Sequence, residues 1–229
     1  MLIRPLRRNL SVVILLFMYP VLLSAHGVSE SDQEILSNGG LLSYILVGAK
    51  HMVTGYDHLL FLTGVIFYLN SFKDIVRFIT VFTIGHSITL IGATYLGIKA
   101  DEHLIDAVIA LSVLYKGFEN LDGFKKFVGV QSPNLLAMVF AFGLIHGFGL
   151  STRLQSFSIG TDQFLAKIIS FNIGVELGQV AALIPIVFII SKWKPWDSYK
   201  TFYKLVNWFL IFAGIALFIF QIYGYFTEH

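Results

Sequence analysis

The chain has 229 residues, a mean hydropathy of +0.76 and a formal net charge of +2. Only 13% of the residues are charged, about half of what a soluble domain carries, and the near-neutral net charge argues against a nucleic-acid partner. Cysteine is absent, which excludes disulfides and thiolate metal sites, so a bound metal must use nitrogen and oxygen ligands. Apolar runs of about 20 residues recur along the chain and predict an all-α, polytopic helical membrane protein in a lipid bilayer.

Residues 1–25 have the pattern of a signal peptide. Three arginines lie near the start, an apolar stretch covers residues 10–23, and Ala25 fits the position before a cleavage site. An uncleaved first anchor helix is the alternative. Cleavage would make His26 the N-terminal residue, and its imidazole and free amine would suit an outer capture site for a cation. The polar segment 26–40 is then expected outside the membrane.

Six apolar segments form the predicted transmembrane domain, residues 41–229. Their approximate ranges are 41–69, 74–98, 103–121, 133–151, 163–191 and 203–226. If residue 26 lies outside, the loops that face inward are much richer in Lys and Arg than the outer loops. This bias follows the positive-inside rule. It predicts a multi-pass membrane protein whose mature N- and C-termini both lie on the outer side.

A short internal similarity suggests two halves of three segments each. Residues 82–87 in the second segment resemble residues 171–176 in the fifth, and the same offset brings Asp57 onto His146. Two three-segment halves would be inverted with respect to the membrane, as in many transporters. Chance similarity between two helices rich in Phe, Ile and Gly is the alternative.

The first segment carries the motif His51-x5-Asp57-His58. On an unbroken helix the two histidines share a face but lie about 10.5 Å apart along the axis, too far to bind one ion at about 2.1 Å each. The motif therefore predicts that the helix opens near Gly55, where glycine permits a break. Alternatively, Asp57 and His58 only bond to neighbouring helices.

Two further histidines lie inside the second and fourth segments. His86, followed by Ser87, falls near the middle of the second segment, and His146 lies in the outward half of the fourth. A histidine within the membrane is either a structural hydrogen-bonding group or a ligand, and the recurrence of such histidines favours ligands. The glycines around His146 also predict close approach of another helix.

The fifth segment carries Asn172, Glu176 and Gln179, which share one helix face by their spacing. A carboxylate near mid-membrane is costly and rarely incidental, so Glu176 is expected to be a metal ligand or a proton carrier. In the third segment, Asp106 and Glu119 are near the ends and could mark the entrance and exit of a pathway. His103 and His229 are expected to be exposed.

These features together resemble the HupE/UreJ family of small bacterial membrane proteins, which is associated with nickel supply to hydrogenase and urease. The resemblance rests on the signal-like start ending at Ala25-His26, the six apolar segments, the His51-x5-Asp57-His58 motif and the element Ile145-His146-Gly147. The first motif is also similar to the His-x4-Asp-His element of nickel and cobalt transporters, with one residue more. The resemblance covers most of the chain in layout but only short stretches in residues.

The resemblance implies metal-binding roles for His51, Asp57 and His58, and less directly for His146. In the family, the fourth-segment element continues into small residues and a Glu, whereas residues 148–153 contain no Glu here. Glu176 is an alternative source of the carboxylate, although the family's motif does not itself support that role. Residues 174–179 suggest a divergent branch of the family.

The sequence thus predicts a divalent metal cation permease with nickel or cobalt as its substrate, and favours a transporter over an enzyme. The expected metal ligands are His51, Asp57, His58, His86, His146 and Glu176, with Asn172, Gln179 and Ser87 in support. The alternative is a zinc-dependent intramembrane hydrolase or acyl transferase in which the metal activates a water, and a bis-histidine haem protein is a third interpretation. No nucleotide-binding motif is present, and a homo-oligomer is compatible with the sequence.

Overall fold

The computed structural model describes residues 32, 35–36, 39–155 and 163–228, apart from the side chains of residues 56 and 57. The predicted signal peptide, residues 1–25, and the proposed capture residue His26 lie outside this part of the chain.

Every regular element in the described part of the chain is a helix, which confirms the all-α prediction. The elements are α3 (Leu41–Thr54), α4 (Tyr56–Val65), α5 (Phe72–Leu96), α6 (Glu102–Asn120), the short π-helix η2 (Phe124–Val128), α7 (Leu135–Leu154), α8 (Phe164–Trp193) and α9 (Asp197–Glu228). Each of the six apolar segments corresponds to one of these helices, except that the first segment is divided into α3 and α4.

Polar residues at the helix ends set where the long helices begin. At the start of α5, the Ser71 side chain accepts a hydrogen bond from the Asp74 backbone N–H, and the Asp74 carboxylate accepts one from the Ser71 N–H. Asp101 and Asn134 cap α6 and α7 through their side-chain oxygens. Gly97 ends α5 in the left-handed region, at φ 66°. These capping residues therefore mark the boundaries of the apolar stretches that form the helices.

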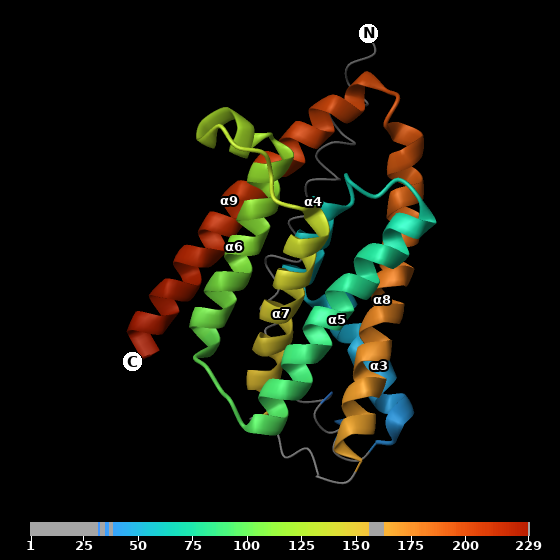
Figure 1. Cartoon of the computed structure of the whole chain (residues 1–229), viewed down its shortest axis with the longest axis vertical. Helices are drawn as coiled ribbons and strands as arrows, with labels where there is room; N and C mark the ends of the chain where they lie inside the picture. The colour runs from blue at the N-terminus through green and yellow to red at the C-terminus, as the bar shows by residue number, and fades with distance from the viewer. Residues whose placement is uncertain (1–31, 33–34, 37–38, 156–162, 229) are drawn as a thin grey trace.

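The helices pack mainly as three pairs (Figure 1): α5 lies along α7, α6 along α9, and α3 along α8. Helices α5 and α8 also contact each other, and this contact joins two of the pairs. Along the chain, α5, α7 and α9 run in the direction opposite to α6 and α8 (Figure 1). Helix α9 lies at one edge of the bundle, beside α6.

Glycines bring paired helices together backbone to backbone. A Cβ added to Gly143 or Gly147 of α7 would clash with a backbone carbonyl of α5, and a Cβ added to Gly48 of α3 or Gly174 of α8 would clash with the backbone of the partner helix. These contacts bear out the predicted packing role of the glycines near His146, because only a missing side chain permits so close an approach.

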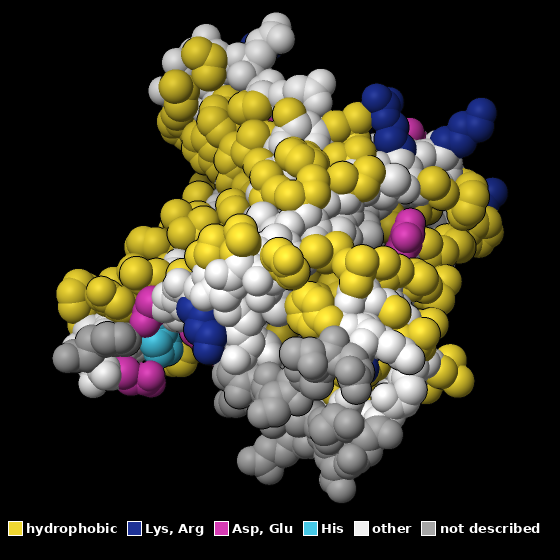
Figure 2. Space-filling model, turned by 60° about the horizontal axis from the view of Figure 1, so that its bottom comes forward, with side chains coloured by type: hydrophobic (Ala, Val, Ile, Leu, Met, Phe, Trp, Pro, Cys, Tyr) yellow, Lys and Arg dark blue, Asp and Glu magenta, His cyan; other side chains and the backbone are white. Residues whose placement is uncertain are grey.

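Four helices in the described residues are long and apolar enough to cross a membrane: α5, α7, α8 and α9. Helix α3 is apolar but has only 14 residues, and α6 carries several charged residues. Hydrophobic side chains cover much of the face shown in Figure 2, with charged side chains in small patches. So extensive an apolar surface is typical of a protein surrounded by lipid. The chain is therefore a helical membrane protein.

Candidate metal centre

The helix of the first segment breaks at Gly55, as the motif spacing predicted. Helix α3 ends at Thr54 and α4 begins at Tyr56, while Gly55 has an extended conformation with φ −68° and ψ 108°. The Gly55 N–H still donates to the His51 carbonyl, and its carbonyl accepts from the Leu59 N–H. The break therefore redirects the chain without leaving the Gly55 backbone groups unpaired.

The break brings the two histidines of the motif together. The ring centroids of His51 and His58 are 5.1 Å apart, whereas an unbroken helix would separate the residues by about 10.5 Å along its axis. The His146 ring of α7 lies 4.9 Å from the His58 ring. Three histidines from α3, α4 and α7 thus form a row with His58 in the middle, and His58 and His146 are buried.

Phenylalanine rings enclose the row and connect it to the fourth histidine. The Phe171 ring of α8 lies 5.7 Å from His51, and the Phe82 ring of α5 lies 5.5 Å from His146. Phe82 also stacks on His86 at 6.1 Å. These two phenylalanines open the internally similar stretches 82–87 and 171–176, but their residue type alone does not mark them as part of a metal site.

Asn172 fixes the orientation and the tautomer of His86. The Asn172 side-chain amide donates to the Ile168 carbonyl at 3.1 Å, so its Oδ1 faces His86. Because that oxygen only accepts, the His86 Nδ1 atom, 3.0 Å away, carries the proton. The Nε2 atom of His86 is then the unprotonated nitrogen, and it has no hydrogen-bond partner among the described residues. This is the state in which an imidazole can bind a metal ion.

The histidines are neighbours but do not form a closed coordination shell in this structure. Among the side chains that the structure describes, no three His, Asp or Glu groups are placed to hold one metal ion as they stand. The side chain of Asp57, the carboxylate of the motif, lies outside the described atoms. Its backbone is in the first turn of α4, between Gly55 and His58.

Glu176 lies apart from the histidines. It is half-buried and lines a cavity between α5 and α8, together with Ser87 and other residues of α5. None of the histidines lines this cavity. Asn172 therefore interacts with His86, and among the described residues no hydrogen bond joins it to Glu176. Gln179 is buried, and its Oε1 atom has no partner in the described part of the chain.

The polar residues at the ends of α6 engage in other interactions. Glu119 forms a buried ion pair with Lys116. Asp106 accepts hydrogen bonds from Arg153 and Gln221. His103, predicted to be exposed, is half-buried; its Nδ1 atom lies 2.7 Å from the Gln221 side-chain oxygen. His229 lies outside the described residues.

The contacts of α5 with α7 match those of α8 with α3. His146 lies beside Phe82 of α5 as His51 lies beside Phe171 of α8. The glycine contacts match as well: Gly143 of α7 approaches the Phe82 carbonyl, and the equivalent glycine of α3 approaches the Phe171 carbonyl. The contacts therefore match His146 with His51, whereas the sequence offset had aligned His146 with Asp57.

Comparisons with known proteins give a match at the level of the family. Neither a curated protein nor a solved structure matches the chain. A family model described as "HupE / UreJ protein" matches residues 29–229, which include every described helix of the bundle. The chain therefore belongs to the HupE/UreJ family.

Proposed function

We propose that this protein is a divalent metal cation permease of the bacterial inner membrane, with nickel or cobalt as its substrate. Membership of a family associated with nickel and cobalt transport supports a metal permease. The observation that carries the proposal within this chain is the row formed by His51, His58 and His146, which a helix break at Gly55 brings together.

The ligand chemistry of the row suits these metals. Imidazole is a ligand of borderline softness that binds nickel, cobalt and zinc. Donor atoms bound to one ion at about 2.1 Å lie roughly 3 Å apart, and rings whose centroids are about 5 Å apart reach that arrangement by side-chain rotation. We infer that His51, Asp57, His58 and His146 bind the ion in turn, and that His86 offers its Nε2 atom from the neighbouring helix.

The proposed topology has six membrane passes, in which α3 and α4 together form the first. The matched contacts of α5–α7 and α8–α3 support two inverted halves, α3 to α6 and α7 to α9. In transporters with this architecture, substrates bind near the midplane between the repeats, often at a broken helix. The break at Gly55 beside the histidine row fits that pattern, and with residue 26 outside both mature termini are periplasmic.

Transport would require the ion to exchange its water for protein ligands. The imidazoles and the Asp57 carboxylate compensate for lost hydration, and the phenylalanine rings exclude water from the row. Metal binding requires neutral imidazoles, so protonation of the row on the cytoplasmic side favours release.

Metal accumulation in cells tests the proposal. Cells that express the wild-type protein should accumulate nickel or cobalt above vector controls, as measured by elemental analysis. His58→Ala should abolish the excess, because His58 is the middle ring of the row. His103→Ala is the matched control, because this histidine interacts with Gln221 and Glu228 outside the row. Unchanged accumulation of both metals by a well-expressed wild-type protein would refute the permease.

A further inference from the structure

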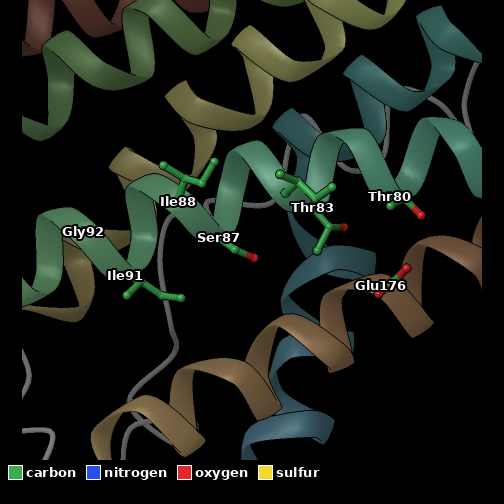
Figure 3. A pocket seen from close by; sticks show the side chains of 8 residues that line it. Thr80, Thr83, Ser87, Ile88, Ile91, Gly92 and Glu176 are labelled. Atoms are coloured by element: carbon green, nitrogen blue, oxygen red, sulfur yellow. The ribbon is translucent and has the colours of Figure 1, made fainter.

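An open cavity of about 460 Å³ lies at the surface of the bundle, between α5 and α8. Its polar lining consists of the hydroxyls of Thr80, Thr83 and Ser87 on α5 and the carboxylate of Glu176 on α8. Figure 3 shows the three hydroxyls pointing from α5 toward the side on which α8 lies. The remaining lining residues are Ile84, Ile88, Ile91 and Gly92. The polar groups of this site are therefore all oxygens.

The negative charge in the cavity is not balanced by the described side chains. No described residue donates a hydrogen bond to Glu176 or forms an ion pair with it, and no Lys, Arg or His lines the cavity. The neighbours of Glu176 on α8, Ile173 and Leu177, are exposed apolar residues, so the carboxylate lies within the apolar surface of the bundle. A lone carboxylate in such surroundings costs several kcal/mol unless a positive charge or a proton joins it.

A second polar atom in the cavity also lacks a partner. The hydroxyl oxygen of Thr83 is buried and makes no hydrogen bond within the described part of the chain. It lies one helical turn from Ser87 on the same face of α5. An acceptor oxygen that is buried without a partner is rare in proteins and calls for a ligand or a water molecule. The hydroxyls and the carboxylate can together replace part of a hydration shell.

The charge and the ligand type indicate which ion fits. Carboxylate and hydroxyl oxygens are hard ligands, unlike the imidazoles of the histidine row. A single carboxylate neutralises one positive charge, so a divalent ion here would retain a net charge inside the membrane. We propose that the cavity is a second cation site, in which Glu176 takes up a monovalent cation, either a sodium ion or a proton, that drives metal transport. This inference rests on the proposed permease function.

The position of the cavity connects it to the metal centre. Glu176 is one helical turn from Asn172 on α8, and Asn172 holds the ring of His86. Ser87 and Glu176 occupy equivalent places in the two internally similar stretches, and both line the cavity. The site thus lies at the contact between the halves, where transporters built from inverted repeats bind coupling ions. Occupation of Glu176 can therefore alter the packing of α5 against α8 beside His86.

Transport by purified protein in liposomes tests the site. Radioactive nickel uptake is measured with an inward sodium gradient, an inward proton gradient or no gradient, at a clamped membrane potential. One of the two gradients should accelerate uptake by about tenfold, within the usual range of coupling between two sites. Glu176→Gln, which removes the negative charge and cannot carry a proton, should retain nickel binding and lose the acceleration. Glu228→Gln, at the end of α9 and outside the cavity, should behave as wild type.

A second variant distinguishes the two cations. Thr83→Val keeps the side-chain shape and removes the hydroxyl. If sodium is the ion, this variant should need a higher sodium concentration for half-maximal acceleration; if the proton is the ion, its pH dependence should equal that of the wild type. Should Glu176→Gln fail to reach the membrane, a pH-sensitive dye in wild-type liposomes reports whether protons enter with nickel, and labelled sodium reports the same for sodium.

The outcomes separate the two proposals. Nickel uptake that neither gradient accelerates, or an acceleration that Glu176→Gln retains, would overturn the second cation site while leaving the permease intact. A folded wild-type protein that moves neither nickel nor cobalt under any gradient would instead overturn the permease.

Discussion

The Nδ1 atom of His86 and the Oδ1 atom of Asn172 are 3.0 Å apart, and this contact joins α5 to α8 inside the bundle. It fixes which nitrogen of His86 carries the proton. The sequence placed both residues inside the membrane, but they are 86 positions apart and only the fold brings them into contact.

Removal of the Asn172 amide should weaken metal binding through His86. In Asn172→Ala the imidazole loses the acceptor that holds its tautomer and orientation. Loss of such a supporting partner typically lowers metal affinity by about 10- to 100-fold. Asn172→Asp retains an acceptor oxygen and should recover most of the affinity. Calorimetric titration of the purified variants with nickel measures both, and equal affinities for Asn172→Ala and wild type would contradict the supporting role of Asn172.

A substitution that favours a continuous helix at Gly55 should impair metal uptake. Alanine favours the helical conformation over glycine by about 1 kcal/mol, so Gly55→Ala shifts the chain toward a continuous helix in which His51 and His58 move apart. A free-energy change of about 1 kcal/mol alters the ratio of broken to continuous helix by about fivefold, so metal uptake should fall by about the same factor. Gly40→Ala is a suitable control, because Gly40 is also extended and a Cβ there meets no atom within 4 Å. Equal uptake by the two variants would contradict the role of the break.

Alanine at the glycines between paired helices should destabilise the protein. A Cβ on Gly85 or Gly174 would clash with the backbone carbonyl of Phe140 or Ile45, respectively, and overpacking of this kind costs about 1–3 kcal/mol. The two substitutions should lower the melting temperature by similar amounts, because they occupy equivalent contacts. Gly92→Ala on α5 adds a Cβ in open space and should leave the melting temperature unchanged or raise it. Thermal unfolding in detergent compares the three variants.

Removing one charge of the buried ion pair of α6 should cost more stability than removing both charges. Lys116 and Glu119 are almost fully buried, and the Lys116 ammonium lies 4.1 Å from the centre of the Tyr68 ring. Glu119→Gln leaves that ammonium without its counter-charge and should destabilise the protein by about 3–5 kcal/mol. The double variant Lys116→Met, Glu119→Gln removes both charges and should recover most of the loss. A double variant as unstable as the single one would show that the pair itself, and not the uncompensated charge, stabilises α6.

Much of the fold could be predicted from the sequence because the length of each apolar stretch, and the polar residues that flank it, are local properties of the chain. The segments between polar caps became the helices, and the motif spacing required the break at Gly55. The position of Glu176 could not be predicted in this way. Residues four apart on a helix differ in direction by about 40°, and at the contact of α8 with α5 this difference separates Asn172, which meets His86, from Glu176, which lines the cavity.

The internal similarity shows a second limit of sequence reasoning. The stretches 82–87 and 171–176 align without gaps, so the equivalence of α5 and α8 was visible. The equivalence of α3 and α7 was not, because the break at Gly55 and the different loop lengths change the offset between the halves. Contacts across helices, such as those of His51 with Phe171 and of His146 with Phe82, were needed to match His146 with His51.

Helices whose main chains touch through glycine have no interlocking side chains to rearrange where they meet. The pairs α3–α8 and α5–α7 are joined in this manner, so each behaves as a stiff unit that tilts or turns as a whole. The contact between α5 and α8, which holds a cavity in place of close packing, is then the natural hinge of the bundle. A movement at this hinge would change the distances between the histidines of the row, since His51 belongs to the α3–α8 pair and His146 to the α5–α7 pair.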